Sequence, residues 1–406
     1  MKILVVSQYY YPEQFRINDV CKELVKRGHE VTVLTGRPNY PEGEIYPGYE
    51  KGFRDNEIVN GVHIIRCNCR ERHKGIVNLA RNYLSFIIQA EKVLNKFKEK
   101  YDSIYVYEVS PVTMALPAIK YGRKTNTPVY LYCMDIWPES VRELSEDRLI
   151  GTSHPIYIAA KILSKYIYRS CDMIGVKCRQ FSDYLEQVCG IDKSKMALLY
   201  EHAEESYLSV QEDPEDNGCY DFMFLGNIGY AQKCDLLLKA VKKVKSDLPY
   251  KLHFVGDGSA LASLKKQTAE MGLEDIVIFH GRKPITEINQ FYNMADCCLL
   301  TLSSKTACGL TPPGKLIGYM AACRPIIAAA EGATKDILEQ GNCGICVENQ
   351  DIEALTSAMQ YALEHQEEFK QKAKNGRKYF MENFTLDFHI SQLEKQLNDM
   401  VARKIK

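Results

Sequence analysis

The N-terminal half of the chain alternates apolar runs with amphipathic stretches. Continuous apolar segments such as KILVVSQ, starting at Lys2, and VYLYCMDIW predict buried parallel strands. Residues 75–98 carry apolar side chains at helical spacing, which predicts a surface helix. Asn18 is placed to cap an earlier helix, and Asn60-Gly61 predicts a hairpin turn. Strands that alternate with helices favour a doubly wound α/β sheet.

The alternation breaks near residue 201 and then restarts. Residues 201–218 are acidic and aperiodic, which indicates a linker. Strands and helices follow again up to residue 383, and residues 384–406 are helical and charged. We therefore predict two Rossmann-like doubly wound domains, 1–200 and 219–383, that face each other across a cleft. The tail, 384–406, is expected to pack back on the first domain.

Charge and composition exclude several classes of protein. The 52 Lys and Arg residues balance 52 Asp and Glu residues, which disfavours nucleic-acid binding. The N-terminus has no signal-peptide cleavage pattern, and no apolar run reaches the ~20 residues of a membrane span. Many of the 15 cysteines lie in apolar runs, so a cytoplasmic, reducing compartment is expected. Cys343 and Cys346 form a lone CxxC pair that is interpreted as structural.

Four successive strand ends in the second half carry glycine. Ligands of open parallel sheets bind beyond the carboxyl ends of the strands, where glycines and helix N-termini suit an anion. Arg282 and Lys315 add cations at two of these ends. Together the four ends predict one anion-lined crevice. The glycines are Gly226, Gly229, Gly256, Gly258, Gly281, Gly309 and Gly314.

In the first half, Asp135 directly follows the apolar run VYLYCM and precedes the single tryptophan, Trp137. It is interpreted either as a helix cap or as a hydrogen-bond acceptor for a sugar hydroxyl or a nucleophilic hydroxyl. His73 lies in a basic loop and His202 at the domain junction. A solvated or packed histidine is the alternative to a functional one at both positions.

These stretches resemble the retaining family-four glycosyltransferases, most closely the bacterial members that build surface polysaccharides such as capsule and O-antigen. The matching pieces are YYYPEQFRINDVCKELVKRGHEVTVLTGRPNYPEGEIYPGY, MDIWPES, FLGNIGYAQKCDLLLKAV, FHGRKP and PGKLIGYMAACRPIIAA. The resemblance implies the GT-B fold, with the donor nucleotide in the C-terminal domain and the acceptor in the N-terminal one. It also implies transfer, with retention of configuration, from a UDP-sugar of N-acetylated hexosamine type to a lipid-linked or glycan acceptor.

The chain departs from the family pattern at the donor site. Two family glutamates correspond to Leu310 and Gly318, and the cations of the diphosphate site correspond to Asn227 and Gln232. Lys315 matches a loop lysine of polysaccharide members. The resemblance thus implies a donor site of Gly226, Asn227, Gln232, Arg282, Gly309, Leu310, Thr311, Gly314 and Lys315. Catalysis is assigned to Asp135, Lys315 and Arg282, and acceptor binding to Glu13, Gln14, Arg16, Arg72 and His73.

The catalytic demand in such a transfer is negative charge on the leaving diphosphate, which cations and backbone amides stabilise. No Asp-x-Asp motif occurs, so no metal or cofactor is expected. Two other functions stay open. A nucleotide-sugar epimerase shares this fold and needs acid/base carboxylates around the sugar, and an inactive nucleotide-sugar-binding subunit is consistent with the missing glutamates.

A further prediction concerns the membrane. Residues 154–170 carry apolar side chains at helical spacing, with cations on another face. Such a helix suits the surface of an anionic inner membrane, although an amphipathic helix packed on the sheet is the alternative. The apolar residues are Ile158, Ile162, Tyr166 and Ile167; the cations are Lys161, Lys165 and Arg169, with Arg66, Arg70, Arg72 and Lys74 in the loop RCNCRERHK.

Overall fold

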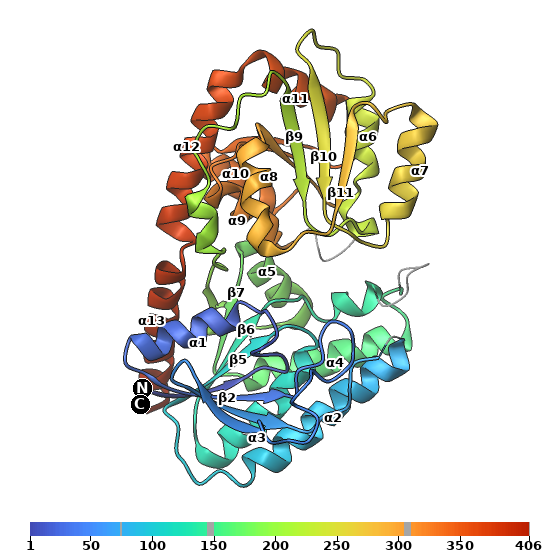
Figure 1. Cartoon of the computed structure of the whole chain (residues 1–406). Coiled ribbons are helices and arrows are strands. Elements are labelled where there is room, and N and C mark those ends of the chain that lie inside the picture. Colours follow the sequence, from blue (N-terminus) through green and yellow to red (C-terminus); the bar gives the residue numbers. More distant parts are fainter. Residues whose placement is uncertain (74, 144–149, 304–309, 406) are drawn as a thin grey trace. The chain divides into compact units, whose positions relative to one another are not determined.

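The computed structural model describes residues 1–73, 75–143, 150–303 and 310–405 (Figure 1). The chain divides into two compact units, and each is described by itself. Unit 1 comprises Met1–Tyr200 and His389–Lys406, and unit 2 comprises Glu201–Phe388. Residues 201–218, interpreted as a linker, belong to unit 2. The segment that returns to unit 1 starts at His389, inside the last helix, and not at residue 384.

Unit 1 is built on an eight-stranded sheet with the order β3-β4-β2-β1-β5-β6-β7-β8. Its neighbouring strands are parallel, except that β3 and β4 form an antiparallel hairpin. Asn60 and Gly61 turn this hairpin at φ values of 52° and 78°, which confirms the predicted turn. The strands are β1 (Lys2–Val6), β2 (Glu30–Gly36), β3 (Asn56–Val59), β4 (Val62–Cys67), β5 (Ser103–Glu108), β6 (Val129–Cys133), β7 (Met173–Val176) and β8 (Met196–Leu198).

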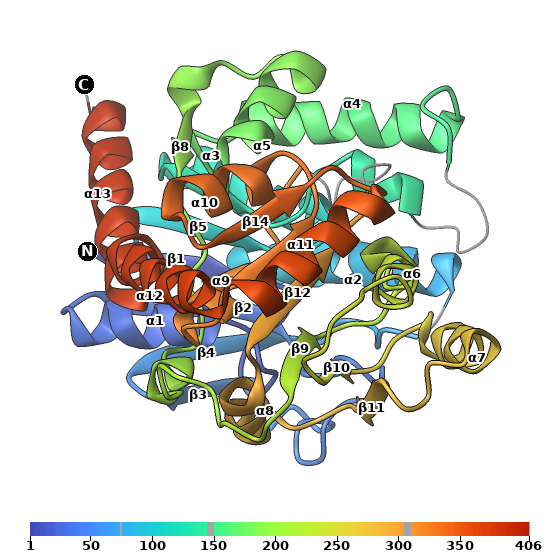
Figure 2. The same ribbon diagram turned by 90° about the horizontal axis from the view of Figure 1, so that it is seen from above.

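Helices flank this sheet. The α-helices are α1 (Ile17–Lys26), α2 (Ile76–Leu94), α3 (Leu116–Thr125), α4 (Pro155–Ser170), α5 (Arg179–Tyr184) and α13 (Leu386–Ile405). Short helical turns are η1 (Val112–Ala115), η2 (Glu139–Glu143), η3 (Leu185–Cys189) and η4 (Lys193–Lys195). Figures 1 and 2 show α13 alongside α1, where Arg27 bonds to Glu394 at 2.8 Å.

The predicted cap of α1 is wrong. The helix begins at Ile17, so Asn18 lies inside its first turn and not at its N-cap. The Asn18 amide instead accepts a hydrogen bond from the N–H of Tyr11 and donates one to the carbonyl of Glu13. Asn18 therefore fixes the loop between β1 and α1.

Unit 2 is built on a six-stranded parallel sheet with the order β11-β10-β9-β12-β13-β14. Its strands are β9 (Tyr220–Leu225), β10 (Tyr250–Val255), β11 (Val277–Gly281), β12 (Cys297–Thr301), β13 (Ile326–Ala329) and β14 (Gly344–Val347). Its α-helices are α6 (Asp235–Val241), α7 (Leu261–Met271), α8 (Ile288–Met294), α9 (Gly314–Ala321), α10 (Ala333–Gly341), α11 (Ile352–Glu364) and α12 (Gln366–Asn383). Short turns are η5 (Glu205–Ser209), η6 (Tyr230–Gln232) and η7 (Ile285–Glu287).

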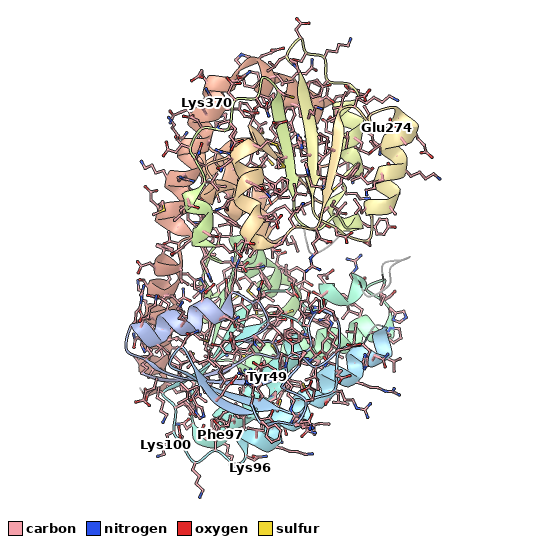
Figure 3. The ribbon with its side chains drawn as sticks, in the orientation of Figure 1. Tyr49, Lys96, Phe97, Lys100, Glu274 and Lys370 are labelled. Atoms are coloured by element: carbon pink, nitrogen blue, oxygen red, sulfur yellow. The ribbon has the colours of Figure 1, made fainter. Side chains whose placement is uncertain are left out.

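The core of each unit consists of its sheet and the helix faces that cover it. In Figure 3, Tyr49 lies inside unit 1, whereas Lys100, Glu274 and Lys370 project from the surface. The cysteines that the structure describes are free thiols, including Cys343 and Cys346. Over the described ranges, no His, Cys, Asp and Glu side chains gather as a set of metal ligands, and no helix is both long and apolar enough to cross a membrane.

The strand orders mark one special position in each sheet. In unit 1, the chain builds outward from β1 in one direction through β2 and in the other through β5. In unit 2, it does the same from β9 through β10 and β12. At such a switch point the connections leave in opposite directions, and ligands bind beyond the carboxyl ends of the strands. The two candidate sites are therefore the loops after β1 and β5 and the loops after β9 and β12.

Candidate functional site

Glycines join the strand ends of unit 2 into one surface. Gly256 has a φ of 150°, and a Cβ there would lie 1.9 Å from the carbonyl oxygen of Gly226. A Cβ on Gly258 would lie 2.5 Å from the carbonyl oxygen of Ile228. The N–H of Gly256 in turn donates to the carbonyl of Gly281 at 2.9 Å. Only glycine allows this close packing of backbones, so the ends of β9, β10 and β11 adjoin, whereas the anion-lined crevice at all four strand ends stays a prediction.

Helix α9 carries Lys315 to the same place. The hydroxyl of Tyr319 accepts a hydrogen bond from the N–H of Leu225 at 3.0 Å, which anchors α9 at the end of β9. Lys315 lies one helical turn before Tyr319, so its side chain reaches the same strand. Its Nζ is 3.7 Å from the centre of the Phe224 ring, and a Cβ on Gly226 would be 3.4 Å from it.

The Lys315 ammonium is buried without a hydrogen-bond partner among the described residues. Burial lowers its pKa to about 8, while the nearby Cys234 raises it. A buried, unpaired charge is costly, and the face of an aromatic ring compensates only in part. An anion at the glycine surface would supply the missing partner.

A neutral amide pair, Asn227 and Gln232, stands where the resemblance implies two cations. The side-chain amide of Asn227 donates to the side-chain oxygen Oε1 of Gln232 at 3.3 Å, and the N–H of Gly229 donates to the same oxygen at 3.1 Å. These contacts shape the turn after β9 and leave Asn227 exposed. Arg282, after β11, is also exposed and makes no hydrogen bond or ion pair within the described chain. Lys315 is therefore the buried cation of this edge, and Arg282 is a solvated one.

The loop before α9 is described in part. Gly309 lies outside the described residues. Leu310 and Thr311 are half-buried, and Gly314 is the first residue of α9. These positions place the loop at the end of β12, which is the second strand of the switch point.

Gly318, which corresponds to a family glutamate, is enclosed by aromatic rings. A Cβ there would lie 3.2 Å from the Tyr292 hydroxyl and 3.3 Å from a ring carbon of Tyr207. The two rings meet edge to face at 5.2 Å. A glutamate would need both rings to shift, so the packing of α8, α9 and η5 disfavours a carboxylate side chain at this position.

Two buried carboxyl groups lie at the corresponding edge of unit 1. Glu13 is 2% exposed, and one of its oxygens accepts the N–H groups of Asn39 and Tyr40 at 2.8 and 2.7 Å. Burial raises the pKa of Glu13 to about 7. Its carboxyl oxygens thus hold the loops after β1 and β2 together, and Glu13, predicted to bind the acceptor, has backbone partners instead of a free face.

Glu108, at the end of β5, was not found from the sequence. Its two oxygens accept the N–H groups of Ser110, Met134 and Asp135 at 3.0, 3.2 and 3.3 Å. Burial, and then the charge of Asp135, raises the pKa of Glu108. Glu108 thereby fixes the backbone at Asp135. The next helical turn, η2, begins only at Glu139, so Asp135 is not its N-cap.

An aromatic cluster surrounds Arg72. Its Nη1 donates to the Tyr9 hydroxyl at 3.2 Å, and its guanidinium carbon lies 5.2 Å from the centre of the Tyr40 ring. Tyr9 also stacks on Phe15 with ring centres 5.4 Å apart. The charge of Arg72 lowers the pKa of Tyr83, although burial raises it more, and Asp135 raises it further. Arg72 and Asp135 thus both lie close enough to Tyr83 to influence its pKa.

The other predicted acceptor residues are exposed or half-buried. Gln14 is exposed, and Arg16 is half-buried at the N-cap of α1. His73 is exposed, with Nε2 3.3 Å from a Glu71 carboxylate oxygen. His202 is buried in unit 2. The roles assigned to Arg72 and Asp135 stay predictions. Their structural partners were not predicted; the signals for them are the carboxylate that ends SIYVYE and the density of tyrosines after β1 and β2.

Two family models match the chain. Glycosyltransferase Family 4 matches residues 15–201, and Glycosyl transferases group 1 matches residues 209–379. The probable glycosyltransferase WbjE of Pseudomonas aeruginosa is 28% identical over 54% of each chain, so that match spans about half of the relative. The putative colanic acid biosynthesis glycosyl transferase WcaI of Escherichia coli K12 is 23% identical over 89% of this chain and 92% of its own.

Solved structures show the same fold. The sucrose-phosphate synthase of Thermosynechococcus elongatus has a TM-score of 0.75 at 16% identity, covering 99% of both chains. Anabaena HepE in complex with UDP has a TM-score of 0.72 at 14% identity, covering 98% of this chain and all of its own. With both domain models matched in order, the chain belongs to the two-domain GT-B glycosyltransferases that join a family-4 domain to a group-1 domain.

Proposed function

We propose that the chain transfers a sugar from a UDP-sugar to a lipid-linked or glycan acceptor during synthesis of a bacterial surface polysaccharide. The observation that supports a donor site in unit 2 is the buried, unpartnered Lys315 ammonium at a glycine-lined switch point. The polysaccharide assignment rests on relatives named for colanic acid and O-antigen synthesis. The choice of UDP rests on the neighbour solved with UDP.

In the proposed sugar transfer, the switch points of unit 1 and unit 2 have different roles. As the bond from the sugar to the diphosphate breaks, negative charge grows on the leaving group, and Lys315 and Arg282 supply positive charge there. In unit 1, the Asp135 carboxylate accepts a hydrogen bond from an acceptor hydroxyl, and Arg72 with its aromatic neighbours holds the acceptor. Retention of configuration follows the family, and the sugar is of N-acetylated hexosamine type.

We also propose a peripheral contact with the cytoplasmic face of an anionic inner membrane through α4. Ile158, Ile162 and Tyr166 are exposed on this helix, as expected, and Ile162 is 67% exposed. Ile167, expected on the same stripe, is instead buried in the core. Flotation with anionic liposomes tests the contact, and replacing Lys161, Lys165 and Arg169 by glutamine should abolish it at low salt.

One residue of the expected basic loop, Arg66, does not support this contact. Arg66 is 3% exposed and pairs with Glu57 at 2.8 Å, because its side chain turns into unit 1. Lys74 lies outside the described residues. Among its described residues, the loop therefore offers Arg70 and Arg72 for this purpose.

The test of function is incubation with matched UDP- and GDP-sugars, with and without a membrane lipid extract. We expect UDP release that depends on the acceptor and persists in excess chelator. The GDP arm is included because one relative is named as GDP-mannose-dependent. Release from GDP-sugars alone would overturn the donor, and loss of activity in chelator that Mg²⁺ or Mn²⁺ restores would overturn metal independence. An epimer formed without acceptor, or binding without turnover, would favour the two alternative functions.

A further inference from the structure

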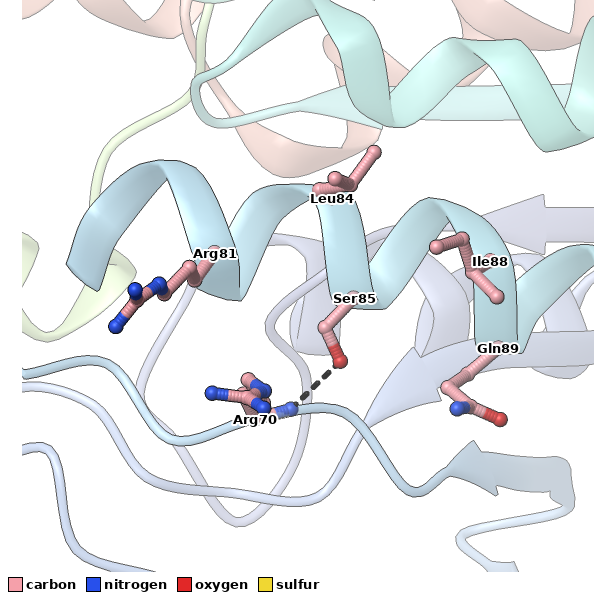
Figure 4. Close-up of a pocket in the computed structure, with 6 residues that line it drawn as sticks. All are labelled: Arg70, Arg81, Leu84, Ser85, Ile88 and Gln89. Atoms are coloured by element: carbon pink, nitrogen blue, oxygen red, sulfur yellow. Dashed lines mark hydrogen bonds between the residues drawn. The ribbon is translucent and has the colours of Figure 1, made fainter. Parts of the chain in front are cut away.

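A groove in unit 1 lies between the loop 67–73 and helix α2, and His73, one of the predicted acceptor residues, lines part of it. It consists of two adjoining hollows that share Arg70 and Arg81. The first, about 500 Å³, is lined by Arg70, Arg81, Leu84, Ser85, Ile88 and Gln89 (Figure 4). The second, about 310 Å³, adds residues of the loops and of the start of α2: Ile45, Asn68, Cys69, Glu71, His73 and Asn78.

Backbone hydrogen bonds fix the loop along the helix. The N–H of Arg70 donates to the Ser85 hydroxyl at 2.9 Å (Figure 4). The carbonyl of Arg70 accepts a bond from the amide of Asn82, which is fully buried. Asn82 is held in turn by Gln8 at 2.6 Å. The backbone of Arg70 is thus positioned through its own polar groups, and its side chain is left to the groove.

The groove is both cationic and apolar. Within the described chain, the guanidinium groups of Arg70 and Arg81 make no hydrogen bond or ion pair. The carboxylate of the lining, Glu71, lies within 3.3 Å of His73. Leu84 and Ile88 are one helical turn apart and are 58% and 45% exposed. A small soluble anion would leave the apolar side chains uncovered, and an uncharged hydrocarbon would leave the two arginines without a partner.

We propose that this groove binds the phosphate and the adjoining hydrocarbon of a lipid-phosphate acceptor, an inference that rests on the proposed transfer to a lipid-linked acceptor. Arg70 and Arg81 bind the phosphate oxygens, for which a planar guanidinium is well suited. Leu84 and Ile88 remove the first methylenes of the chain from water. Arg72, which follows Arg70 by two residues, contacts Tyr9 and Tyr40. The loop therefore connects the groove to the proposed acceptor site at the ends of β1 and β5.

The test is binding of decyl phosphate to the full chain, by calorimetry below its micellar concentration and without donor. Decanol supplies the chain without the charge, and inorganic phosphate supplies the charge without the chain. We expect decyl phosphate to bind at least tenfold more tightly than either. The double variant Arg70→Gln/Arg81→Gln should weaken it about tenfold or more, and Leu84→Ser/Ile88→Ser should weaken decyl phosphate and decanol alike.

A matched control removes two exposed cations elsewhere in unit 1, by Lys22→Gln and Lys395→Gln, and should stay within twofold of the wild type. Wild-type affinity in Arg70→Gln/Arg81→Gln would overturn the proposal. Equal affinity for inorganic phosphate and decyl phosphate would also overturn it, because this result indicates a site for free phosphate. An equal loss of affinity in the control variant would overturn it as well, because this result indicates general charge attraction. Because the assay contains no donor, a failure of the UDP-sugar assignment leaves its result unchanged.

Discussion

The two units place different chemistry at the same position of similar sheets. At the switch point of unit 2, backbone forms the surface, because Gly226, Gly256 and Gly258 carry no side chains, and the buried Lys315 ammonium lies against Gly226. At the switch point of unit 1, side chains fill the corresponding place, with Glu13 and Glu108 bonded to backbone N–H groups. A diphosphate needs amides and positive charge at close range, whereas a sugar acceptor needs shaped side chains. The comparison shows that similar sheets differ in chemistry through their loops, and under the proposed function this difference would separate the donor edge from the acceptor edge.

Gly256→Ala should have the largest effect on stability, because it disrupts the close backbone contact between the ends of β9 and β10. The new Cβ would lie 1.9 Å from the carbonyl oxygen of Gly226. We expect a loss of about 3–5 kcal/mol in the free energy of unfolding of unit 2. Denaturant unfolding followed by circular dichroism measures it.

The single tryptophan offers an internal reference for this experiment. Trp137 belongs to unit 1, so its fluorescence should report an unchanged transition. Gly272→Ala is the matched control: Gly272 also has a positive φ, but nothing lies within 4 Å of its Cβ position, so about 1 kcal/mol is expected. Equal losses of stability in the two variants would show that the contact between Gly226 and Gly256 contributes no more than an ordinary glycine turn.

The second prediction separates binding from stability at the unit 2 edge. Lys315→Met keeps the length of the side chain and removes the charge. UDP affinity should fall by about 1.5–3 kcal/mol, the value of a charge-assisted hydrogen bond. The free protein should become about 1–3 kcal/mol more stable at pH 7, because the wild-type pKa of about 8 means that folding disfavours the charged form. If Lys315→Met loses stability, or binds UDP with unchanged affinity, the Lys315 ammonium is not an anion-binding group.

How much of this the sequence predicts differs between the two edges. Glycines at strand ends are local signals, so Gly226, Gly256 and Lys315 can be located from spacing and resemblance. The enclosure of Lys315 over Phe224 depends on Tyr319 anchoring α9 to β9, which is a contact between segments far apart in the chain. Glu108 and Asp135 likewise meet only because β5 and β6 pair in register.

The third prediction concerns pH. Only the ammonium form of Lys315 attracts a diphosphate, and in the free protein its pKa is about 8. As pH rises from 7 to 9 the charged fraction falls, so UDP affinity should drop about tenfold. The stability of the free protein should rise over the same range, toward the ordinary lysine pKa of 10.5. Calorimetry at several pH values gives the profile, and Lys315→Met should be flat; a wild type that is equally flat would contradict the assignment.

The smallest expected effect tests whether unit 1 is organised before its ligand arrives. Both edges set a cation over an aromatic ring, but Lys315 is enclosed, whereas Arg72 is half-exposed over Tyr40 at 5.2 Å. Partly solvated pairs of this kind contribute about 0.5–1 kcal/mol. A double-mutant cycle of Arg72→Gln and Tyr40→Leu, with unfolding followed by Trp137 fluorescence, should return that coupling energy. Arg54 and Tyr49, with the guanidinium 5.0 Å from the ring centre, form a comparison pair away from Asp135. A coupling energy near zero for Arg72 and Tyr40, with a normal value for Arg54 and Tyr49, would mean that the proposed acceptor site of unit 1 forms only when the acceptor binds. The switch point of unit 2 would then be the preorganised site of the two.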